Sequence, residues 1–162
     1  MIDRRGLLLG GAVAAVLAYV GASRRGSAAT RPETFEVTHT DAEWRRMLSP
    51  EAYQVLRHEG TEAPGSSPLD HDYRKGVYAC AGCALPVFDA ATKFDSHTGW
   101  PSFWTPIPGA IRTRSDTSLL MVRTEVHCRR CGGHLGHVFN DGPKPTGLRY
   151  CMNGVAMTFK PA

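Results

Sequence analysis

The sequence has little net charge outside its first 29 residues. Residues 1–29 account for +3 of the formal net charge of +4, which leaves +1 for residues 30–162. A protein that binds nucleic acid or an anionic membrane surface normally shows a clustered excess of Lys and Arg. We therefore expect no nucleic-acid partner, and nothing in the charge of residues 30–162 favours a membrane surface.

The sequence also lacks an apolar run of the length that a membrane-spanning helix needs. The run from Leu7 to Ala22 has 16 residues, many of them Ala and Gly, whereas a span takes about 20. Two adjacent arginines, Arg4 and Arg5, precede the run, and the small residues Ser27-Ala28-Ala29 follow it. This order of charged, apolar and small residues is typical of a secretory signal.

We expect residues 1–29 to be an export signal and residues 30–162 to be the folded domain. The paired arginines favour the twin-arginine route, which carries folded proteins, and a periplasmic destination. Arg24 and Arg25, beyond the apolar run, are unusual for a cleaved signal. An uncleaved signal that anchors the chain to the membrane therefore stays open as the alternative.

Cysteine is scarce: four of the five cysteines lie in two close pairs, and the fifth stands alone. Cys80 and Cys83 form one C-x-x-C pair, and Cys128 and Cys131 form another. Two such pairs suffice for a tetrahedral Zn²⁺ site. Disulfides are the alternative in an oxidising compartment, but the cysteines within each pair are too close for an easy structural bridge. We expect one structural zinc ion per chain, which leaves Cys151 free to react.

The pattern of residues 40–162 indicates a mainly β domain. Thr40 to Leu48 and Ser49 to Leu56 each begin with a capping residue, followed by apolar residues at helical spacing, which predicts two short helices. Residues 118–126, which lead to the second cysteine pair, form the best strand candidate, and residues 148–153 and 154–159 are two more. Helices followed by many short strands predict an antiparallel β domain with a helical cover.

Cys151 lies among polar residues at the spacing of one strand face. Arg149 and Asn153 are each two residues away, so the three side chains share a face of a strand. A nucleophilic cysteine needs a nearby cation and a proton source, which Arg149 and the nearby histidines His134 and His137 can supply. The two histidines face opposite ways on a regular strand and converge in a loop or turn. Alternative roles for the two histidines are zinc ligation and a purely structural role. The alternative role for Cys151 is that of a small, buried apolar residue.

Aromatic residues are concentrated in residues 96–104. Trp100, Phe103 and Trp104 lie within five residues of one another, among Gly and Pro. This composition suits a core strand poorly and favours an exposed apolar pocket wall. The alternative is a surface loop that aromatic packing holds in place.

The sequence resembles the methionine-R-sulfoxide reductase family, the B type. The resemblance runs in order over about residues 40–160 and rests on the stretches Leu48–Tyr53, Gly60–Glu62, Gly76–Cys83, Lys93–Ser96, Gly99–Phe103, Cys128–Pro143 and Gly147–Asn153. It implies a fold of two antiparallel sheets with short N-terminal helices and a structural Cys₄ zinc site. It also implies reduction of the R epimer of methionine sulfoxide, free or in proteins.

The resemblance further implies a role for each candidate site residue. Cys151 is the expected nucleophile, and it becomes a sulfenic acid. Trp100 is expected to hold the substrate methyl group, with Phe103 as a second substrate-binding ring. The residues expected to bind the sulfoxide oxygen are His134, His137 and Asn153. Those expected to supply supporting charges are Arg149 and Asp141.

The sequence departs from part of this family just before its Gly-Trp-Pro-Ser-Phe motif. Some members carry a second cysteine there, which resolves the sulfenic acid as a disulfide, whereas this chain has His97-Thr98. Since the other four cysteines are assigned to zinc, we expect an external reductant, either a thioredoxin-like protein or a small thiol. The expected substrates are oxidised proteins. We expect the protein to be a monomer.

Two other functions fit parts of the sequence. A zinc-knuckle binding module without catalysis needs only the two C-x-x-C pairs. A cysteine hydrolase would use Cys151 with His134 or His137, but no oxyanion loop is evident.

Overall fold

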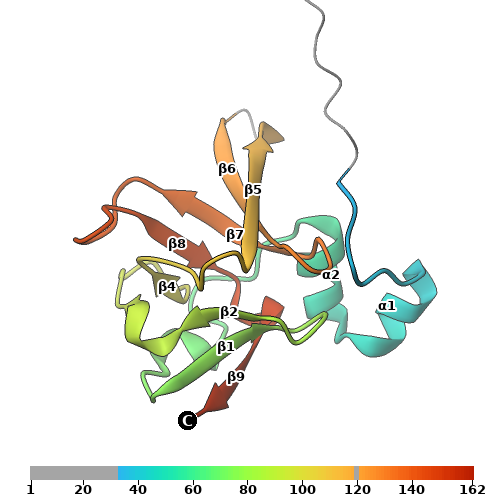
Figure 1. The fold of residues 1–162 in the computed structure, drawn as a ribbon, viewed down its shortest axis with the longest axis horizontal. Coiled ribbons are helices and arrows are strands. Elements are labelled where there is room, and N and C mark those ends of the chain that lie inside the picture. Colours follow the sequence, from blue (N-terminus) through green and yellow to red (C-terminus); the bar gives the residue numbers. More distant parts are fainter. Residues whose placement is uncertain (1–32, 119–120) are drawn as a thin grey trace, which may run out of the picture. The chain divides into compact units, whose positions relative to one another are not determined.

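The computed structural model describes residues 33–118 and 121–162, which form two antiparallel β-sheets (Figure 1). The predicted export signal, residues 1–29, lies outside the described residues. The larger sheet has six strands in the order β3-β4-β8-β7-β6-β5, and the smaller has three in the order β2-β1-β9. Their bounds are β1 Gly76–Cys80, β2 Pro86–Asp89, β3 Lys93–Phe94, β4 Ser102–Phe103, β5 Ile111–Asp116, β6 Arg123–Cys128, β7 His134–Phe139, β8 Arg149–Met152 and β9 Met157–Pro161.

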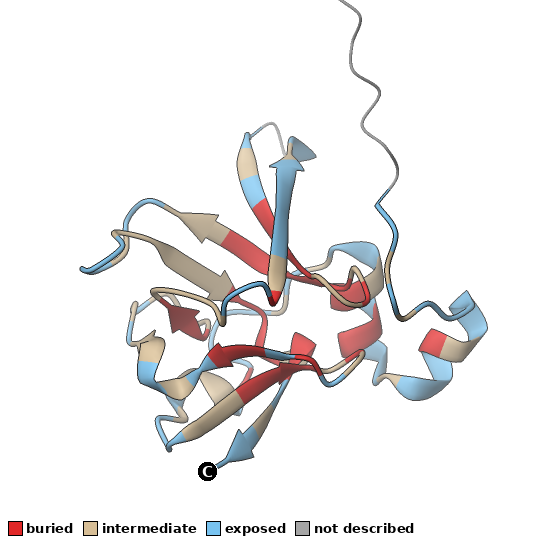
Figure 2. Cartoon of the chain, viewed as in Figure 1, coloured by how far each residue is buried: buried red, intermediate tan, exposed pale blue. Residues whose placement is uncertain are grey.

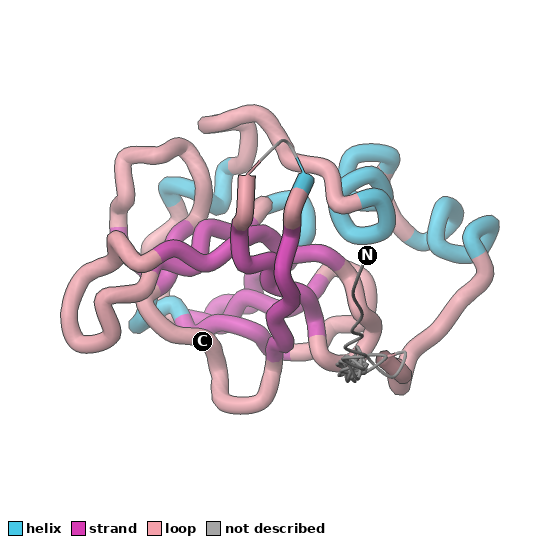
Figure 3. The backbone as a smooth tube through the Cα atoms, turned by 90° about the horizontal axis from the view of Figure 1, so that it is seen from above, coloured by secondary structure: helices cyan, strands magenta, loops and turns pink. Residues whose placement is uncertain are grey.

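Two short helices precede the strands, as the capping signals predict. α1 (Asp41–Met47) begins at a capping box in which Thr40 and Glu43 exchange hydrogen bonds. α2 (Pro50–His58) begins at Ser49, whose hydroxyl accepts a backbone N–H of the first turn. Figure 3 shows helical segments beside the strands. Short 3₁₀ turns that lie wholly within the described residues are η1 Pro68–His71, η2 Ala90–Thr92 and η4 Gly154–Ala156.

Within the part of the chain that the structure describes, no helix has the length and apolar character needed to cross a membrane.

The core lies between the two sheets and under α2. Phe103 of β4 stacks on Phe88 of β2, with ring centroids 4.4 Å apart, and Tyr78 of β1 meets the Phe103 ring edge-on at 5.0 Å. These three side chains are completely buried. Val55 and Leu56 of α2 join the same core, and Figure 2 shows the buried segments on the facing elements. Burial of these apolar side chains is the main favourable term in folding.

The strand predicted for residues 118–126 is shorter than expected. β6 begins only at Arg123, and the side chains of Met121 and Val122 are 52% and 83% exposed. The sequence pattern does not predict its partner β5, because β5 is largely polar and exposed and so lacks an apolar alternation. The strand predicted for residues 154–159 begins instead with η4, and only its later residues belong to β9.

The pairing of β6 with β7 slips by one residue, next to the predicted site. Val126 lies opposite Gly136, but the next residue of β6 lies opposite His134. Leu135 is therefore an extra residue, which makes a β-bulge. At the bulge β7 approaches β8 so closely that a Cβ atom on Gly136 would lie 2.1 Å from the carbonyl oxygen of Cys151. Only glycine fits this position.

Gly136→Ala should lower the free energy of unfolding by about 3 kcal/mol, because the added methyl group meets backbone that cannot rotate away. Urea unfolding followed by circular dichroism measures the loss. Gly109→Ala is the matched control, since Gly109 also has a positive φ of +70° but nothing within 4 Å of the added methyl group. The control should lose only about 1 kcal/mol. Equal losses in the two variants would contradict the close approach of β7 to β8.

Candidate active site and metal centre

One row of polar side chains crosses the larger sheet. Cys151 of β8 lies opposite Ser102 of β4 on one side and opposite His137 of β7 on the other. The row continues through Glu125 of β6 to Arg114 of β5. Because directly opposite residues point to the same face of a sheet, all five side chains share one face. Cys151 thus has a hydroxyl neighbour on one strand and an imidazole neighbour on the other.

The bulge in β7 brings His134 to the same face as His137. Residues three apart on a regular strand point to opposite faces, but the extra residue restores them to one face. Their ring centroids lie 5.2 Å apart. The two histidines therefore converge on a strand, and not in a loop or turn as the sequence suggests.

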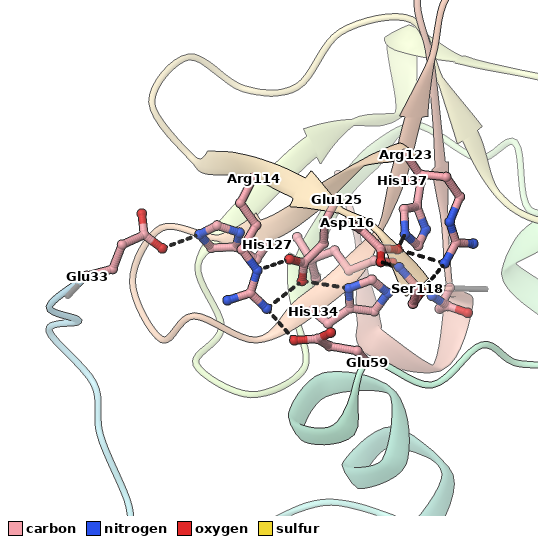
Figure 4. Close-up of polar contacts among 12 residues, drawn as sticks. Glu33, Glu59, Arg114, Asp116, Ser118, Arg123, Glu125, His127, His134 and His137 are labelled. Atoms are coloured by element: carbon pink, nitrogen blue, oxygen red, sulfur yellow. Dashed lines mark hydrogen bonds and ion pairs between the residues drawn. The ribbon is translucent and has the colours of Figure 1, made fainter. Parts of the chain in front are cut away.

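Each of these histidines is held by a carboxylate, through a different ring nitrogen (Figure 4). Nδ1 of His134 lies 2.8 Å from Glu125, and both side chains are 2% exposed. Nε2 of His137 lies 2.7 Å from Asp116. A carboxylate accepts the ring N–H and so fixes which nitrogen carries the proton. The other nitrogen of each ring is left for other partners, and Nε2 of His134 is buried with no hydrogen-bond partner among the described residues.

Two arginines support these carboxylates from the far side. Arg114 binds both Glu125 and Glu59. Arg123 donates to Asp116 at 2.7 Å. Each histidine–carboxylate pair therefore ends in a guanidinium that comes from the β5–β6 hairpin.

Hydrogen bonding and burial together set the charges at these pairs. Hydrogen bonds from Ser118, and then from His137, hold the pKa of Asp116 well below its usual value. Burial raises the pKa of Glu125, but hydrogen bonds from its histidine and arginine partners outweigh burial, and the pKa is lowered overall. Burial lowers the pKa of His137, and Asp116 opposes that shift. Near neutral pH the site therefore holds two carboxylates and a mostly neutral His137.

A cavity of about 130 Å³ lies beside Cys151. It brings together four predicted site residues, Trp100, His137, Cys151 and Asn153. His134 contacts the ring of His137 but does not line the cavity. The remaining lining residues, which the sequence does not single out, are Thr61, Arg123, Gly136, Phe139 and Met152.

Glu62 holds Trp100 and Asn153 in place at the cavity. The Trp100 indole N–H donates to the Glu62 carbonyl oxygen at 3.1 Å, and Oδ1 of Asn153 accepts the Glu62 N–H at 2.9 Å. Nδ2 of Asn153 also donates to the carbonyl oxygen of Leu135 at 3.2 Å. The carboxylate of Glu62 accepts two backbone N–H groups of η4. One N–H of the Asn153 amide is left for a ligand.

Burial and charge act in opposite directions on the Cys151 thiol. Burial raises its pKa, and the Arg149 guanidinium and the hydroxyls of Thr98 and Ser102 oppose that shift in part. Arg149 donates twice to Asp141, at 2.9 and 2.8 Å. The Asp141 side chain is 61% exposed and does not line the cavity. It therefore acts on the thiol only through Arg149.

Phe103 does not line the cavity. Its neighbour Ser102 points to the face that carries Cys151, so Phe103 points to the opposite face. There it is completely buried in the core. The expectation that Phe103 binds the substrate is therefore corrected, because it is a core residue that fixes β4 behind the site.

The other four cysteines form a separate cluster. Their Sγ atoms all lie within 4.8 Å of one another, with Cys80 and Cys131 at 3.7 Å and Cys83 and Cys128 at 3.5 Å. A disulfide would need about 2.05 Å, whereas sulfurs at about 2.3 Å from a tetrahedral zinc ion lie roughly 3.8 Å apart. The donor atoms and their spacing therefore suit a metal such as zinc.

The cysteine cluster joins the two sheets. Cys80 ends β1 of the smaller sheet, and Cys128 ends β6 of the larger. Each C-x-x-C pair is followed by a left-handed residue, Ala84 at φ +57° and Gly132 at φ +68°. A Cβ atom on Gly132 would lie 2.5 Å from the Phe35 ring. The turn after the second pair therefore requires glycine.

Asp116, Glu125 and Arg123 are site residues that the sequence analysis does not find. Glu125 and Arg123 leave a weak signal, since they are charged residues in a strand that ends at a metal-ligand candidate. Asp116 leaves none. Its contact with His137 depends on the pairing of β5 with β6 and of β6 with β7, which local sequence does not reveal.

A family model described as the SelR domain matches residues 48–161. The chain belongs to the SelR family. Peptide methionine sulfoxide reductase MsrB of Agrobacterium fabrum (strain C58) is 53% identical over 127 residues, which cover 78% of this SelR chain and 94% of that protein.

Two further relatives carry the same name. The protein of Pseudomonas putida (strain W619) is 56% identical over 128 residues, which cover 78% of this chain and 96% of that protein. The protein of Methanosarcina barkeri (strain Fusaro) is 53% identical over 125 residues, which cover 76% of this chain and 88% of that protein. The resemblance to the methionine sulfoxide reductase B family is therefore confirmed.

Asp116→Asn should lower the pKa of His137 in this SelR chain. The imidazolium loses the carboxylate that stabilises it, so the ring gives up its proton at a lower pH. NMR titration of the His137 ring measures both the pKa and the tautomer. Asp95→Asn is the matched control, because Asp95 pairs at 3.2 Å with the exposed His97 and should leave His137 unchanged. An unchanged His137 titration in Asp116→Asn would contradict the assigned pair.

Proposed function

We propose that this chain reduces methionine-R-sulfoxide to methionine, free or in proteins, with Cys151 as the nucleophile. The cavity in which Cys151, His137 and Trp100 meet carries this proposal. Membership of the SelR family, and relatives named peptide methionine sulfoxide reductase MsrB, support the same reaction.

The cavity suits the end of an oxidised methionine side chain. At about 130 Å³ it has room for a small group and not for a folded segment. We assign the substrate methyl group to the apolar face of Trp100. We assign the sulfoxide oxygen to the remaining N–H of Asn153 and, once it carries the proton of the thiol, to His137. Methionine lacks that oxygen, so polar donors at this place favour the sulfoxide over the reduced side chain.

The reaction transfers one oxygen atom from the substrate to Cys151. The thiolate attacks the sulfoxide sulfur, the sulfur–oxygen bond of the substrate breaks, and a sulfur–oxygen bond to Cys151 forms. A thiol and a sulfoxide thereby become a sulfenic acid and a thioether, so the cysteine sulfur is oxidised and the substrate sulfur is reduced by the same two electrons. The thiol proton ends on the transferred oxygen. We assign its transfer to His137, the cross-strand neighbour of Cys151.

Regeneration of Cys151 requires a reductant from outside the chain. The residues that line the cavity include no second cysteine, and the other four cysteines lie in the cluster. We assign the step to a thioredoxin-like protein or a small thiol. The external thiol displaces water from the sulfenic acid to form a mixed disulfide, and a second thiol then releases Cys151.

We assign one structural zinc ion per chain to Cys80, Cys83, Cys128 and Cys131. When bound it would close four ligand positions and leave none for substrate. Its contribution would be to hold the end of β1 to the end of β6, and hence one sheet to the other.

We further propose that residues 1–29 direct export by the twin-arginine route, and that residues 30–162 act as a monomer in the periplasm. The paired arginines and the apolar run that follows them support the proposal. Retention at the membrane by an uncleaved signal is its alternative.

The purified protein with dithiothreitol should reduce the R epimer of a methionine sulfoxide substrate and leave the S epimer intact. Chromatography that separates the two epimers measures both. Cys151→Ser should fall to background, because serine cannot supply a thiolate, and His137→Asn should lose about a hundredfold in rate. His71→Asn, at a histidine whose side chain is 79% exposed, is the matched control and should keep full activity. Reduction of the S epimer alone would refute the proposal, and full activity in Cys151→Ser would refute the nucleophile.

Cys128→Ser should lose the bound zinc and lower the Tm by at least about 10 °C, because metal binding to such a cluster contributes directly to the free energy of folding. Elemental analysis and thermal unfolding measure the two effects. Cys151→Ser is the control and should retain one zinc ion per chain with an unchanged Tm. If Cys128→Ser kept its zinc, the assigned ligand set would be wrong.

A further inference from the structure

A chain of hydroxyl groups reaches Cys151 from the β4 side of the polar row. Oγ1 of Thr98 lies 4.0 Å from the Cys151 sulfur, within reach of a hydrogen bond to sulfur. Oγ of Ser96 lies 2.8 Å from Thr98 Oγ1 and 2.7 Å from Oγ of the completely buried Ser102. The Ser102 hydroxyl contacts the carbonyl oxygen of Trp100 at 3.0 Å. Consecutive hydrogen bonds thus join the thiol to the backbone of a cavity residue.

The Trp100 carbonyl fixes the direction of every bond in this chain. A hydroxyl has one proton to donate, and a carbonyl oxygen only accepts. Ser102 therefore donates to Trp100, and its contact with Ser96 needs the Ser96 proton. The contact between Ser96 and Thr98 then needs the Thr98 proton. No Thr98 proton is left for Cys151, so the neutral thiol is the donor and Thr98 the acceptor.

Ionisation of Cys151 reverses the last bond. A thiolate only accepts, so it competes with Ser96 for the single proton of Thr98. The Thr98 hydroxyl can serve either by turning about its Cβ–Oγ bond. Hydrogen bonds to an ionised group are roughly twice as strong as those between neutral groups, so the thiolate takes the proton. Ser96 keeps the bond that it donates and loses only the bond that it accepted.

We propose that Thr98 is a further catalytic residue, whose hydroxyl donates a hydrogen bond to the Cys151 thiolate while Ser96 competes for the same proton. The other groups that face the thiol are Ser102 on β4, Arg149 on the same strand and His137 on β7. Arg149 and His137 are already bound to carboxylates, and the Ser102 proton is bound to the Trp100 carbonyl oxygen. Thr98 is a donor whose direction can change with the charge on the sulfur.

The direction of the pKa shifts of the thiol agrees with this geometry. Burial raises the pKa of Cys151, and after Arg149 the hydrogen bond from Thr98 is one of the contacts that lower it. A buried thiol with one cation nearby gains from a second donor, because the thiolate and not the thiol is the nucleophile.

The pH profile of Cys151 alkylation by iodoacetamide tests the proposal on the full, metal-loaded chain, with the Cys151 peptide followed by mass spectrometry. Thr98→Val removes the hydroxyl and keeps the shape of the side chain. At a fixed pH below the midpoint it should slow alkylation about tenfold, while the limiting rate at high pH stays unchanged. Thr98→Ser, which keeps the hydroxyl, should retain the wild-type profile. A Thr98→Val profile equal to that of the wild type would overturn the proposal.

Ser96→Ala should shift the profile in the opposite direction. Thr98 then loses no bond when it turns to the sulfur, so alkylation at the same pH should rise about fivefold. Thr146→Val is the matched control, because it removes a hydroxyl that donates to the Trp104 carbonyl oxygen at 2.6 Å and is not part of the chain. A Ser96→Ala profile that does not move to lower pH would overturn the assigned direction.

This proposal rests on the proposed role of Cys151, but the two fail separately. Alkylation reads the reactivity of the thiol without any sulfoxide. If the protein reduced neither epimer, the alkylation profiles of Thr98→Val and Ser96→Ala would still shift in opposite directions or fail to, and so would still decide this proposal.

Discussion

The one-residue slip between β6 and β7 is the constraint on which the site depends. Without the extra residue Leu135, His134 and His137 would lie on opposite faces of the sheet, and only one of them could accompany Cys151. The slip also brings Gly136 against the backbone of Cys151. A single irregularity in strand pairing therefore orients both imidazoles and sets how closely the strand of Cys151 approaches them.

Charges on a sheet face need partners, and these explain why β5 is largely polar and exposed and contributes little to the core. An ionised carboxylate taken out of water costs several kcal/mol unless it is paired and hydrogen-bonded. Glu125 binds one histidine and Arg114, and Asp116 binds the other histidine and Arg123. All four of these residues belong to β5 and β6. The polar side chains of the β5–β6 hairpin are thus the support that orients the histidines.

Local sequence predicts the parts of this structure that depend on neighbours in the chain. Capping residues find both helices, and spacing finds the cysteines that cluster. Features that depend on strand pairing are missed. Phe103 is misassigned because only the register of β4 shows which of its two side chains faces Cys151. Asp116 is missed because its contact with His137 crosses two strand pairings. Convergence of the histidines is expected only in a loop or turn, because the bulge that brings them together on a strand leaves no local signal.

The surroundings of Cys151 would keep the proposed nucleophile unreactive until substrate binds. Burial raises its pKa, so near neutral pH the thiol is the dominant form, and a thiol is a poor nucleophile. In that form the direction of the hydroxyl chain leaves Thr98 with no proton for the sulfur. A sulfoxide in the cavity would exclude water and give His137 an oxygen to protonate, which favours loss of the thiol proton. Ionisation is then coupled to bound substrate. Such coupling would limit stray oxidation of Cys151, which proceeds through the thiolate.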